Sequence, residues 1–537
     1  MDAHGGRLAV EVLRAHGVDV IFTLSGGHLF VLYDGAVQAD LRLVDTRHEQ
    51  TATFAAEGWA KVTRRLGCAA LTAGPGVTNG ISAMTAAGMN GTPMVVIGGR
   101  APERRWGSGS LQELDHVPIV APVVKRAATA VDADAIVREL HASCVAARTP
   151  HRGPTFVDVP LDGFGPGSVD LPDLDDVNAP GSGVVPDNIK TVGALIASAQ
   201  QPVVLAGGDV YWGHAEEQLV AFAEAAGVPV FVNGMGRGTI PADHRFAFAR
   251  SRSVAMKEAD LVIVAGTPLD FRLGFGRFGD AKVVHLCDAP SEVARHADLA
   301  ASTAGDLAAT FAALADSGAP PGRFTTWVEK LRADENAKRA DEEAGLHAEG
   351  APIKPTRIYG ELRPRLDRDA IVIGDGGDFV SYAGKLIDSY QPGTFLDPGP
   401  YGCLGMGPGY ALAAGLAHPD RQVVLLLGDG AAGFSLGDFE ALIRHEVDVV
   451  AVVGNNGIWG LEKHPMQMLF GYDVVAELRP EVRYDKVVTA LGGHGECVSH
   501  PDEIGPALDR AFATKGVSLI NVFTDPADAY PRSSNLG

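Results

Sequence analysis

The chain has 537 residues, too many for a single hydrophobic core, and its length predicts roughly three or four units of about 150 residues. Hydrophobic residues make up 46% of the chain and charged residues 21%, a balance that excludes extensive disorder. The formal net charge is −21, and no run of lysine and arginine offers a surface for a phosphate backbone, so we expect no nucleic-acid partner.

Short apolar, β-branched runs that end in Gly or Asp and precede helix-like stretches recur along the chain. In chain order, the predicted strands are 18–22, 41–45, 69–72 and 94–97, then 203–206, 228–232, 261–265 and 282–286, and finally 370–373, 423–427, 449–453 and 518–523. This alternation predicts an α/β fold with parallel sheets that are covered by helices on both faces.

Two stretches of turn-forming composition separate three groups of strands. Residues 163–187 are rich in Pro, Gly and Asp, and residues 317–355 enclose a charged helical segment between flanks that contain Pro and Gly. We interpret both stretches as linkers. The sequence therefore predicts three doubly wound domains, at residues 1–165, 188–317 and 355–537.

The cysteines and the N-terminus bear on where the protein works. The five cysteines lie far apart without a C-x-x-C pair, which argues against a disulfide framework or a structural zinc site and favours a reducing compartment. The N-terminus lacks the pattern of a signal peptide, and no apolar run approaches the length of a membrane span. We therefore expect a cytoplasmic protein that does not insert into membranes.

Two motifs in the last group follow strands at their carboxyl ends, where open α/β sheets bind ligands. The first is Gly428-Asp429-Gly430, and the second begins with Asn455 and Asn456. Asp429 offers a carboxylate and Asn456 a carbonyl oxygen, and both are ligands suited to Mg²⁺, with diphosphate oxygens completing the shell. The adjacent glycines let the backbone approach a phosphate closely.

A GDG motif followed some two dozen residues later by NN resembles the signature of thiamin diphosphate-dependent enzymes. Here 24 residues separate Gly430 from Asn455. Two unrelated turns are the alternative interpretation. The resemblance implies that Asp429 and Asn456 bind the metal through their side chains and that Ile458 binds it through its backbone carbonyl.

The segment Arg47-His48-Glu49 begins a helical pattern in the first domain. On its own, Glu49 is a first-turn carboxylate that favours the helix dipole. Thiamin diphosphate enzymes carry a similar segment, whose glutamate forms a hydrogen bond with a nitrogen of the aminopyrimidine ring and so activates the cofactor. The resemblance thus implies a pyrimidine-binding first domain, a central domain and a diphosphate-binding last domain. Family members combine the outer two from different subunits, so we expect at least a homodimer, and a tetramer as in many relatives.

The glycine-rich segment 399–411 resembles a turn before a helix in oxalyl-CoA decarboxylases and 2-hydroxyacyl-CoA lyases, although a generic helix start is the alternative. The tail 532–537 resembles tails that close over CoA, or is a frayed end. We therefore favour a lyase that reversibly cleaves a 2-hydroxyacyl-CoA substrate into formyl-CoA and an aldehyde or ketone.

Segments 24–28 and 110–113 resemble acetolactate synthase, which acts on pyruvate, and this is the alternative. A silent regulatory homologue is a second alternative, against which the intact Glu49 and Asp429 argue.

The resemblance implies a set of site residues. The catalytic candidates are Glu49, Gln112 and His28, and the implied cofactor contacts are Gly26, Gly27, Thr72, Gly74, Asp378, Gly402, Leu404, Gly428, Gly430, Ala431, Asn456 and Ile458. His28 and His116 are candidate proton donors, with a structural role as the alternative for each. Glu496 is a further candidate acid or base, with a solvated surface carboxylate as the alternative.

The central domain departs from relatives that bind FAD or ADP. Pro268 stands where they carry an arginine, and Cys287 where they carry the ribose-binding aspartate, with Asp288 one residue later. These departures argue against FAD and leave ADP or another nucleotide open. The residues that keep the character of a nucleotide site are Gly207, Gly208, Asn233, Gly234 and Arg272.

Overall fold

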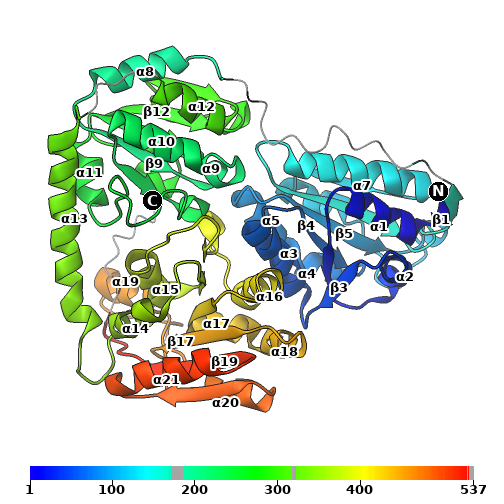
Figure 1. Ribbon diagram of the computed structural model, residues 1–537. Helices are drawn as coiled ribbons and strands as arrows, with labels where there is room; N and C mark the ends of the chain where they lie inside the picture. Colours follow the sequence, from blue (N-terminus) through cyan, green and yellow to red (C-terminus); the bar gives the residue numbers. More distant parts are fainter. Residues whose placement is uncertain (169, 171–182, 184, 317–321, 529, 531–537) are drawn as a thin grey trace.

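The computed structural model describes residues 1–168, 170, 183, 185–316, 322–528 and 530, and the chain forms three α/β domains (Figure 1). Each domain contains one parallel sheet with helices packed on both faces. The predicted fold class, three doubly wound parallel sheets, is confirmed. Each predicted strand group lies within one of these sheets, whereas the domain boundaries stay a prediction.

The first domain contains six parallel strands in the order β3-β2-β4-β5-β7-β6. The strands are β2 (Val20–Thr23), β3 (Arg42–Asp45), β4 (Gly67–Leu71), β5 (Met94–Arg100), β6 (Arg126–Thr129) and β7 (Pro154–Pro160). The helices are α1 (Gly5–Ala15), α2 (Phe30–Gln38), α3 (Glu49–Thr63), α4 (Pro75–Asn79), α5 (Ile81–Met89), α6 (Val117–Val120) and α7 (Ala133–Arg148). A small antiparallel pair, β1 (Asp2–His4) and β8 (Pro166–Ser168), joins the two ends of the domain.

The central domain contains five parallel strands in the order β10-β9-β11-β12-β13. The strands are β9 (Pro202–Ala206), β10 (Val230–Val232), β11 (Leu261–Ala265), β12 (Lys282–Cys287) and β13 (Ala301–Ala304). The helices are α8 (Ile189–Ser198), α9 (Gly208–Trp212), α10 (Glu216–Ala226), α11 (Arg252–Glu258), α12 (Leu307–Ala315) and α13 (Thr325–Leu346). Asp306 caps α12 by accepting hydrogen bonds from two backbone amides of its first turn.

Helix α13 gives the second predicted linker a definite structure. Trp327 and Leu331 are buried in an apolar cluster with the central sheet, and the Glu335 carboxylate accepts from the backbone N–H groups of Ala249 and Ser251. Figure 1 shows the helix running along the edge of the central domain toward the last one. The described part of this segment is therefore packed against the central domain, which its charged composition did not predict.

The last domain contains six parallel strands in the order β15-β14-β16-β17-β19-β18. The strands are β14 (Ile371–Asp375), β15 (Phe395–Leu396), β16 (Val423–Gly428), β17 (Val449–Asn455), β18 (His494–Val498) and β19 (Val517–Phe523). The helices are α14 (Pro355–Leu362), α15 (Gly377–Leu386), α16 (Gly407–Ala417), α17 (Asp429–Ser435), α18 (Phe439–Arg444), α19 (Gly460–Phe470), α20 (Tyr484–Ala490) and α21 (Pro501–Ala513).

Helices α3 and α16 join the first domain to the last one (Figure 1). Glycines allow their close approach, because a Cβ on Gly58 would lie 2.9 Å from the Cα of Tyr410 and one on Gly409 would lie 2.8 Å from the backbone oxygen of Thr51. The apolar cluster around Phe54 continues across the junction into the sheet of the last domain. The helix that begins with Glu49 is thus fixed between two domains.

Among the described helices, none is both long enough and apolar enough to cross a membrane.

Candidate active site

Glu49 occupies the first turn of α3 and is almost fully buried. The helix begins there because the preceding His48 is extended and its side chain accepts from the backbone N–H of Gln50. The Glu49 Oε2 atom accepts a hydrogen bond of 3.0 Å from the Asn79 side chain at the end of α4. This bond orients the carboxylate that the sequence predicted to activate the cofactor.

Several predicted residues of the first domain converge at the carboxyl ends of its strands. A Cβ on Gly26 would lie 2.3 Å from the Thr72 side chain, and a Cβ on Gly74 would lie 3.0 Å from the Cβ of Gln112. The Thr72 hydroxyl lies 3.4 Å from Nδ1 of His28. The structure thus brings His28, Gly26, Thr72, Gly74 and Gln112 into one cluster, next to the exposed Gly27.

The protonation of His28 follows from its surroundings. Burial lowers the pKa of the imidazole, a hydrogen bond to the backbone of Leu111 opposes this, and nearby His116 lowers the pKa further. The ring is therefore neutral at pH 7, so it offers an N–H donor rather than a positive charge.

His116 is fully buried and has both ring nitrogens engaged. Its Nε2 accepts from the backbone N–H of Gly74 over 2.9 Å, and its Nδ1 donates to Asp158 over 3.0 Å. Asp158 also pairs with Arg100 at 3.3 Å. Since neither nitrogen of His116 is free, the structural role that the sequence offered as the alternative fits this residue.

The metal motif in the last domain has its predicted ligands side by side. Asp429 begins α17 at the end of β16, and its Oδ2 accepts from the backbone N–H of Gly457 over 2.7 Å. The Asn456 Oδ1 accepts from the backbone N–H of Ile458 over 3.1 Å. Burial raises the pKa of Asp429 to about 6, despite backbone hydrogen bonds that lower it. A divalent cation would relieve this buried negative charge.

The ends of β14 and β16 form a narrow, glycine-lined cradle. A Cβ on Gly376 would lie 2.5 Å from the side chain of Leu404 and 2.8 Å from that of Ala431, and one on Gly428 would lie 3.5 Å from the backbone oxygen of Gly376. A Cβ on Gly430 would meet the Trp459 ring at 2.4 Å. The predicted residues Leu404 and Ala431 therefore pack against Gly376, and Gly428 lies close to its backbone, so a side chain on Gly376 would collide with its neighbours.

Asp375 holds the glycine-rich turn in place beside this cradle. It is fully buried at the end of β14, and its two carboxylate oxygens accept from the backbone N–H groups of Gly405 and Gly407. Burial raises the pKa of Asp375 to about 7, although the two hydrogen bonds lower it. The turn includes Gly402, whose φ of 71° suits glycine and which has open space on its Cβ side.

Asp378, a cofactor contact implied by the resemblance, lies next to the metal motif. Its Oδ2 accepts from the Asn456 side chain at 3.4 Å, and burial raises the pKa of its carboxyl while nearby His464 lowers it. The Nε2 atom of His464 is buried, and no described residue hydrogen-bonds it.

The sequence interpretation assigned no individual role to three residues of this region: Asp375, Asp158 and His464. Two of them carried a signal, since a carboxylate at the end of, or inside, an apolar strand run needs a buried partner. Asp158 stands within the run Phe156–Val159, and Asp375 directly follows Ile371–Gly374. Glu496, in contrast, lies on the edge strand β18 and pairs with Arg510 of α21. This position fits the alternative interpretation of Glu496 as a surface carboxylate.

The central domain does not present Asp288 as an available ribose contact. Its Oδ1 lies 3.2 Å from Nδ1 of His151, and its Oδ2 lies 3.6 Å from Arg152. Arg272 pairs with Asp270, and the Asn233 side chain accepts from Arg252. The nucleotide therefore stays a prediction. The tail 532–537 lies outside the described residues.

The residues present fit thiamin diphosphate and a divalent metal. A buried carboxylate and an amide oxygen stand at two adjacent strand ends, and the glycine cradle adjoins them. Backbone N–H groups and strand ends of this kind hold anions together with a metal. The first domain separately contributes the Glu49 carboxylate.

Comparisons with known proteins give the family. Models described as "Thiamine pyrophosphate enzyme" match the N-terminal TPP binding domain at residues 3–119, the central domain at 189–314 and the C-terminal TPP binding domain at 375–522. The acetolactate synthase large subunit IlvG of Mycobacterium tuberculosis is 54% identical over 537 residues, covering 99% of this chain and 98% of that protein. The 2-hydroxyacyl-CoA lyase 2 of Caenorhabditis elegans is 33% identical, covering 98% and 90%, and the human one is 31% identical, covering 93% and 86%. The chain therefore belongs to the thiamin diphosphate-dependent enzymes, in the branch of acetolactate synthase and 2-hydroxyacyl-CoA lyase.

Proposed function

We propose that the chain is a carboligase of the acetolactate synthase type, which decarboxylates pyruvate and joins the remaining two-carbon unit to a second 2-keto acid. The observation that carries this proposal is the 54% identity to an acetolactate synthase across 99% of the chain. It replaces our first preference from the sequence, since the relatives named 2-hydroxyacyl-CoA lyase 2 are only 33% and 31% identical.

In this proposal, Asp429, Asn456 and the carbonyl of Ile458 would hold Mg²⁺, and the cradle around Gly376 would take the diphosphate. When bound, thiamin diphosphate supplies the electron sink that lets the bond to the carboxylate carbon break. The protein itself orients the reactants and excludes water.

Glu49 holds a proton at the aminopyrimidine ring, and Asn79 keeps its carboxylate oriented. Such proton transfer by a positioned side chain contributes about 10²–10⁴-fold to a rate. Neutral His28 and Gln112 face the reacting carbonyl group of the substrate, where an uncharged N–H stabilises negative charge on oxygen. His116 acts on this cluster indirectly, because it fixes the backbone of Gly74.

We also propose that the active form is at least a homodimer, in which Glu49 of one copy serves the metal site of the other. Exposed apolar side chains support this, and they lie near the site residues of the first domain and near those of the last domain. In the first domain, Phe30 is 62% exposed and Leu111 78%, and in the last domain, Phe434 is 61% exposed and Tyr401 44%. Apolar groups at such positions indicate surfaces that another protein surface covers.

The test is a paired assay of the purified chain with thiamin diphosphate and Mg²⁺. With pyruvate alone, we expect release of carbon dioxide together with acetolactate. A 2-hydroxyacyl-CoA substrate, followed by thioester analysis, tests the lyase as the second candidate, which the resemblance of segment 399–411 favours. Formyl-CoA without acetolactate would reverse the order of the two candidates. Bound cofactor with neither product would indicate a silent homologue.

A further inference from the structure

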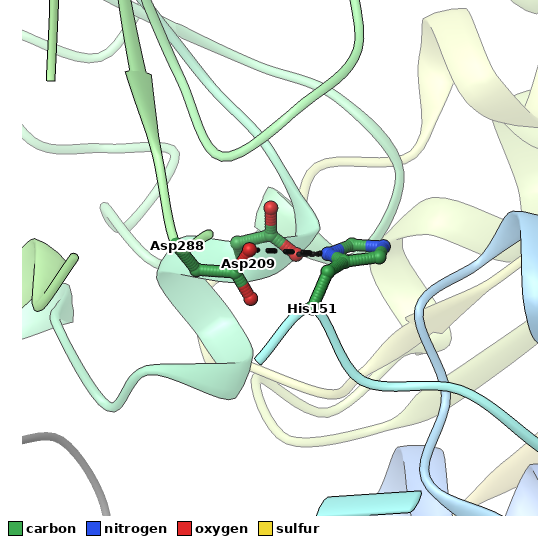
Figure 2. Close-up of side chains that lie close together, drawn as sticks. All are labelled: His151, Asp209 and Asp288. Atoms are coloured by element: carbon green, nitrogen blue, oxygen red, sulfur yellow. Dashed lines mark hydrogen bonds and ion pairs between the residues drawn. The ribbon is translucent and has the colours of Figure 1, made fainter. Parts of the chain in front are cut away.

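A second group of ligand-type side chains lies outside the last domain, where the first domain meets the central one (Figure 2). His151 comes from the segment between α7 and β7, Asp209 from α9, and Asp288 from the residue after β12. The Nδ1 atom of His151 lies 3.3 Å from Oδ1 of Asp209 and 3.2 Å from Oδ1 of Asp288. Figure 2 shows both carboxylates directed at the same ring nitrogen.

The spacing of these atoms matches that of ligands around one ion. Zinc binds imidazole nitrogen and carboxylate oxygen at about 2.0–2.2 Å, which places neighbouring tetrahedral ligands roughly 3.3–3.5 Å apart. The three ligand atoms all lie within 4.8 Å of one another, and the two distances from His151 already approach this spacing. A small shift of one carboxylate would complete three corners of a tetrahedron, with water at the fourth.

The group also contains a buried oxygen that lacks a hydrogen bond. The side chain of Asp288 is only 7% exposed, and its Oδ2 accepts no hydrogen bond from the described residues, although Nη1 of Arg152 lies 3.6 Å away. Arg152 balances charge on the Oδ2 side of Asp288, which leaves Oδ1 directed at His151.

The imidazole of His151 is held in position before any ion binds. Gly91 packs against it so closely that a Cβ there would lie 2.8 Å from both Cε1 and Nε2 of the ring. Lys125 donates to the backbone oxygens of Thr149 and His151 over 2.7 and 2.6 Å. A site whose ligands are fixed by packing and by outer hydrogen bonds binds metal without a large ordering cost.

We propose that His151, Asp209 and Asp288 bind a divalent transition-metal ion, of which Zn²⁺ is the best match, and that this ion joins the first domain to the central one. A nitrogen ligand with two carboxylates selects Zn²⁺ over Mg²⁺, which prefers octahedral oxygen shells. The site is thus separate, in position and in metal preference, from the Mg²⁺ motif at Asp429. A proton on Nδ1 of His151, shared by the two carboxylates, is the competing occupant.

The test measures retained metal and needs no turnover. The full chain, saturated with thiamin diphosphate and Mg²⁺, is stripped with a chelator, reloaded with Mg²⁺, incubated with Zn²⁺ and dialysed, and zinc is counted by mass spectrometry. We expect about one Zn²⁺ per chain, and at least tenfold weaker binding in Asp288→Asn and in His151→Gln. Asp243→Asn, which removes an exposed carboxylate paired with Arg368, is the matched control and keeps the wild-type zinc content.

A second measurement uses the unaltered protein, so it does not depend on whether the variants fold. Co²⁺ takes the place of Zn²⁺, and X-ray absorption at the cobalt edge reports its ligands. We expect a four-coordinate shell of nitrogen and oxygen that includes one imidazole. Zinc content that is absent from the wild type, or that is unchanged in both variants, would overturn the proposal. A cobalt shell that contains sulfur or lacks imidazole would do the same.

Discussion

The ammonium group of Lys61 donates to the hydroxyl of Tyr410 over 2.7 Å, and this bond joins α3 of the first domain to α16 of the last. The same Nζ atom lies 2.9 Å from Oε1 of Glu57, and both charged side chains are at most 1% exposed. Glu57 in turn accepts from the Asn90 side chain at 2.8 Å. The helix that begins with Glu49 is therefore joined to the last domain by a hydrogen bond from Lys61, whose charge is balanced within the helix by Glu57.

Lys61→Met leaves the Glu57 carboxylate buried without its cation, so we expect a loss of about 3–5 kcal/mol in the free energy of unfolding. The double variant Glu57→Gln with Lys61→Met removes both charges and should recover much of this loss. Urea denaturation of both variants measures the difference. Lys515→Met, which removes a 93% exposed side chain paired with Asp448, is the control and should change little. Equal stability of Lys61→Met and this control would contradict the argument.

Glu49→Gln keeps the size of the side chain and removes the carboxylate that, in the proposed function, holds a proton at the cofactor. We expect the turnover number to fall by about 10²–10⁴-fold, while the affinity for thiamin diphosphate changes little. Steady-state kinetics and a cofactor titration provide the two readings. Glu329→Gln, on the exposed face of α13, should retain full activity. A Glu49→Gln enzyme that turned over at the wild-type rate would rule out this role for the carboxylate.

Asp429→Asn weakens a direct metal ligand in the proposed site. Even outer-shell substitutions cost about 10–100-fold in metal affinity, so the Mg²⁺ concentration for half-saturation should rise at least tenfold. Because the Trp459 ring packs against Gly430, its fluorescence offers the readout in a titration with thiamin diphosphate present. Asp509→Asn, at a 63% exposed carboxylate, serves as the control. An unchanged Mg²⁺ titration would remove Asp429 from the ligand set.

His16 makes the first domain sensitive to acid. Burial, Arg148 and His141 together lower the pKa of its imidazole to about 4. Because the folded pKa lies below the unfolded value of 6.5, the unfolded chain binds the extra proton, and stability present above pH 6.5 is lost as the pH falls toward 4. We expect the decrease in Tm between pH 6.5 and 4.5 to be smaller in His16→Gln by about 2–4 °C, the shift that roughly 1 kcal/mol gives a domain of this size.

The control for His16 is His347→Gln, since His347 is 68% exposed at the end of α13. Its Tm should follow that of the wild type through the same pH range. If the decrease in Tm on acidification is the same in His16→Gln, in His347→Gln and in the wild type, another group is responsible for the acid sensitivity.

The strands and the strand-end motifs were predictable because they are local patterns. Buried parallel strands appear as continuous apolar runs, and Asp429 and Asn456 directly follow two of them. The contacts of Asp158 and His151 were not predictable in the same way. His116 lies 42 residues from Asp158 and His151 lies 137 residues from Asp288, and no periodicity in the sequence records such pairs. The packing of α13 against the central domain was not predictable either, because most residues of this helix are charged or exposed and only a few are buried.

The burial of α3 limits how the enzyme can diverge. Glu49 and every residue from Thr51 to Lys61 are shielded from solvent, so almost any replacement along this helix disturbs two domains at once. The segment around Gln112 differs, since residues 103–105 and 107–109 are exposed and Leu111 is 78% exposed. New substrate preferences in homologues should therefore arise from changes in this loop, while α3 stays nearly constant.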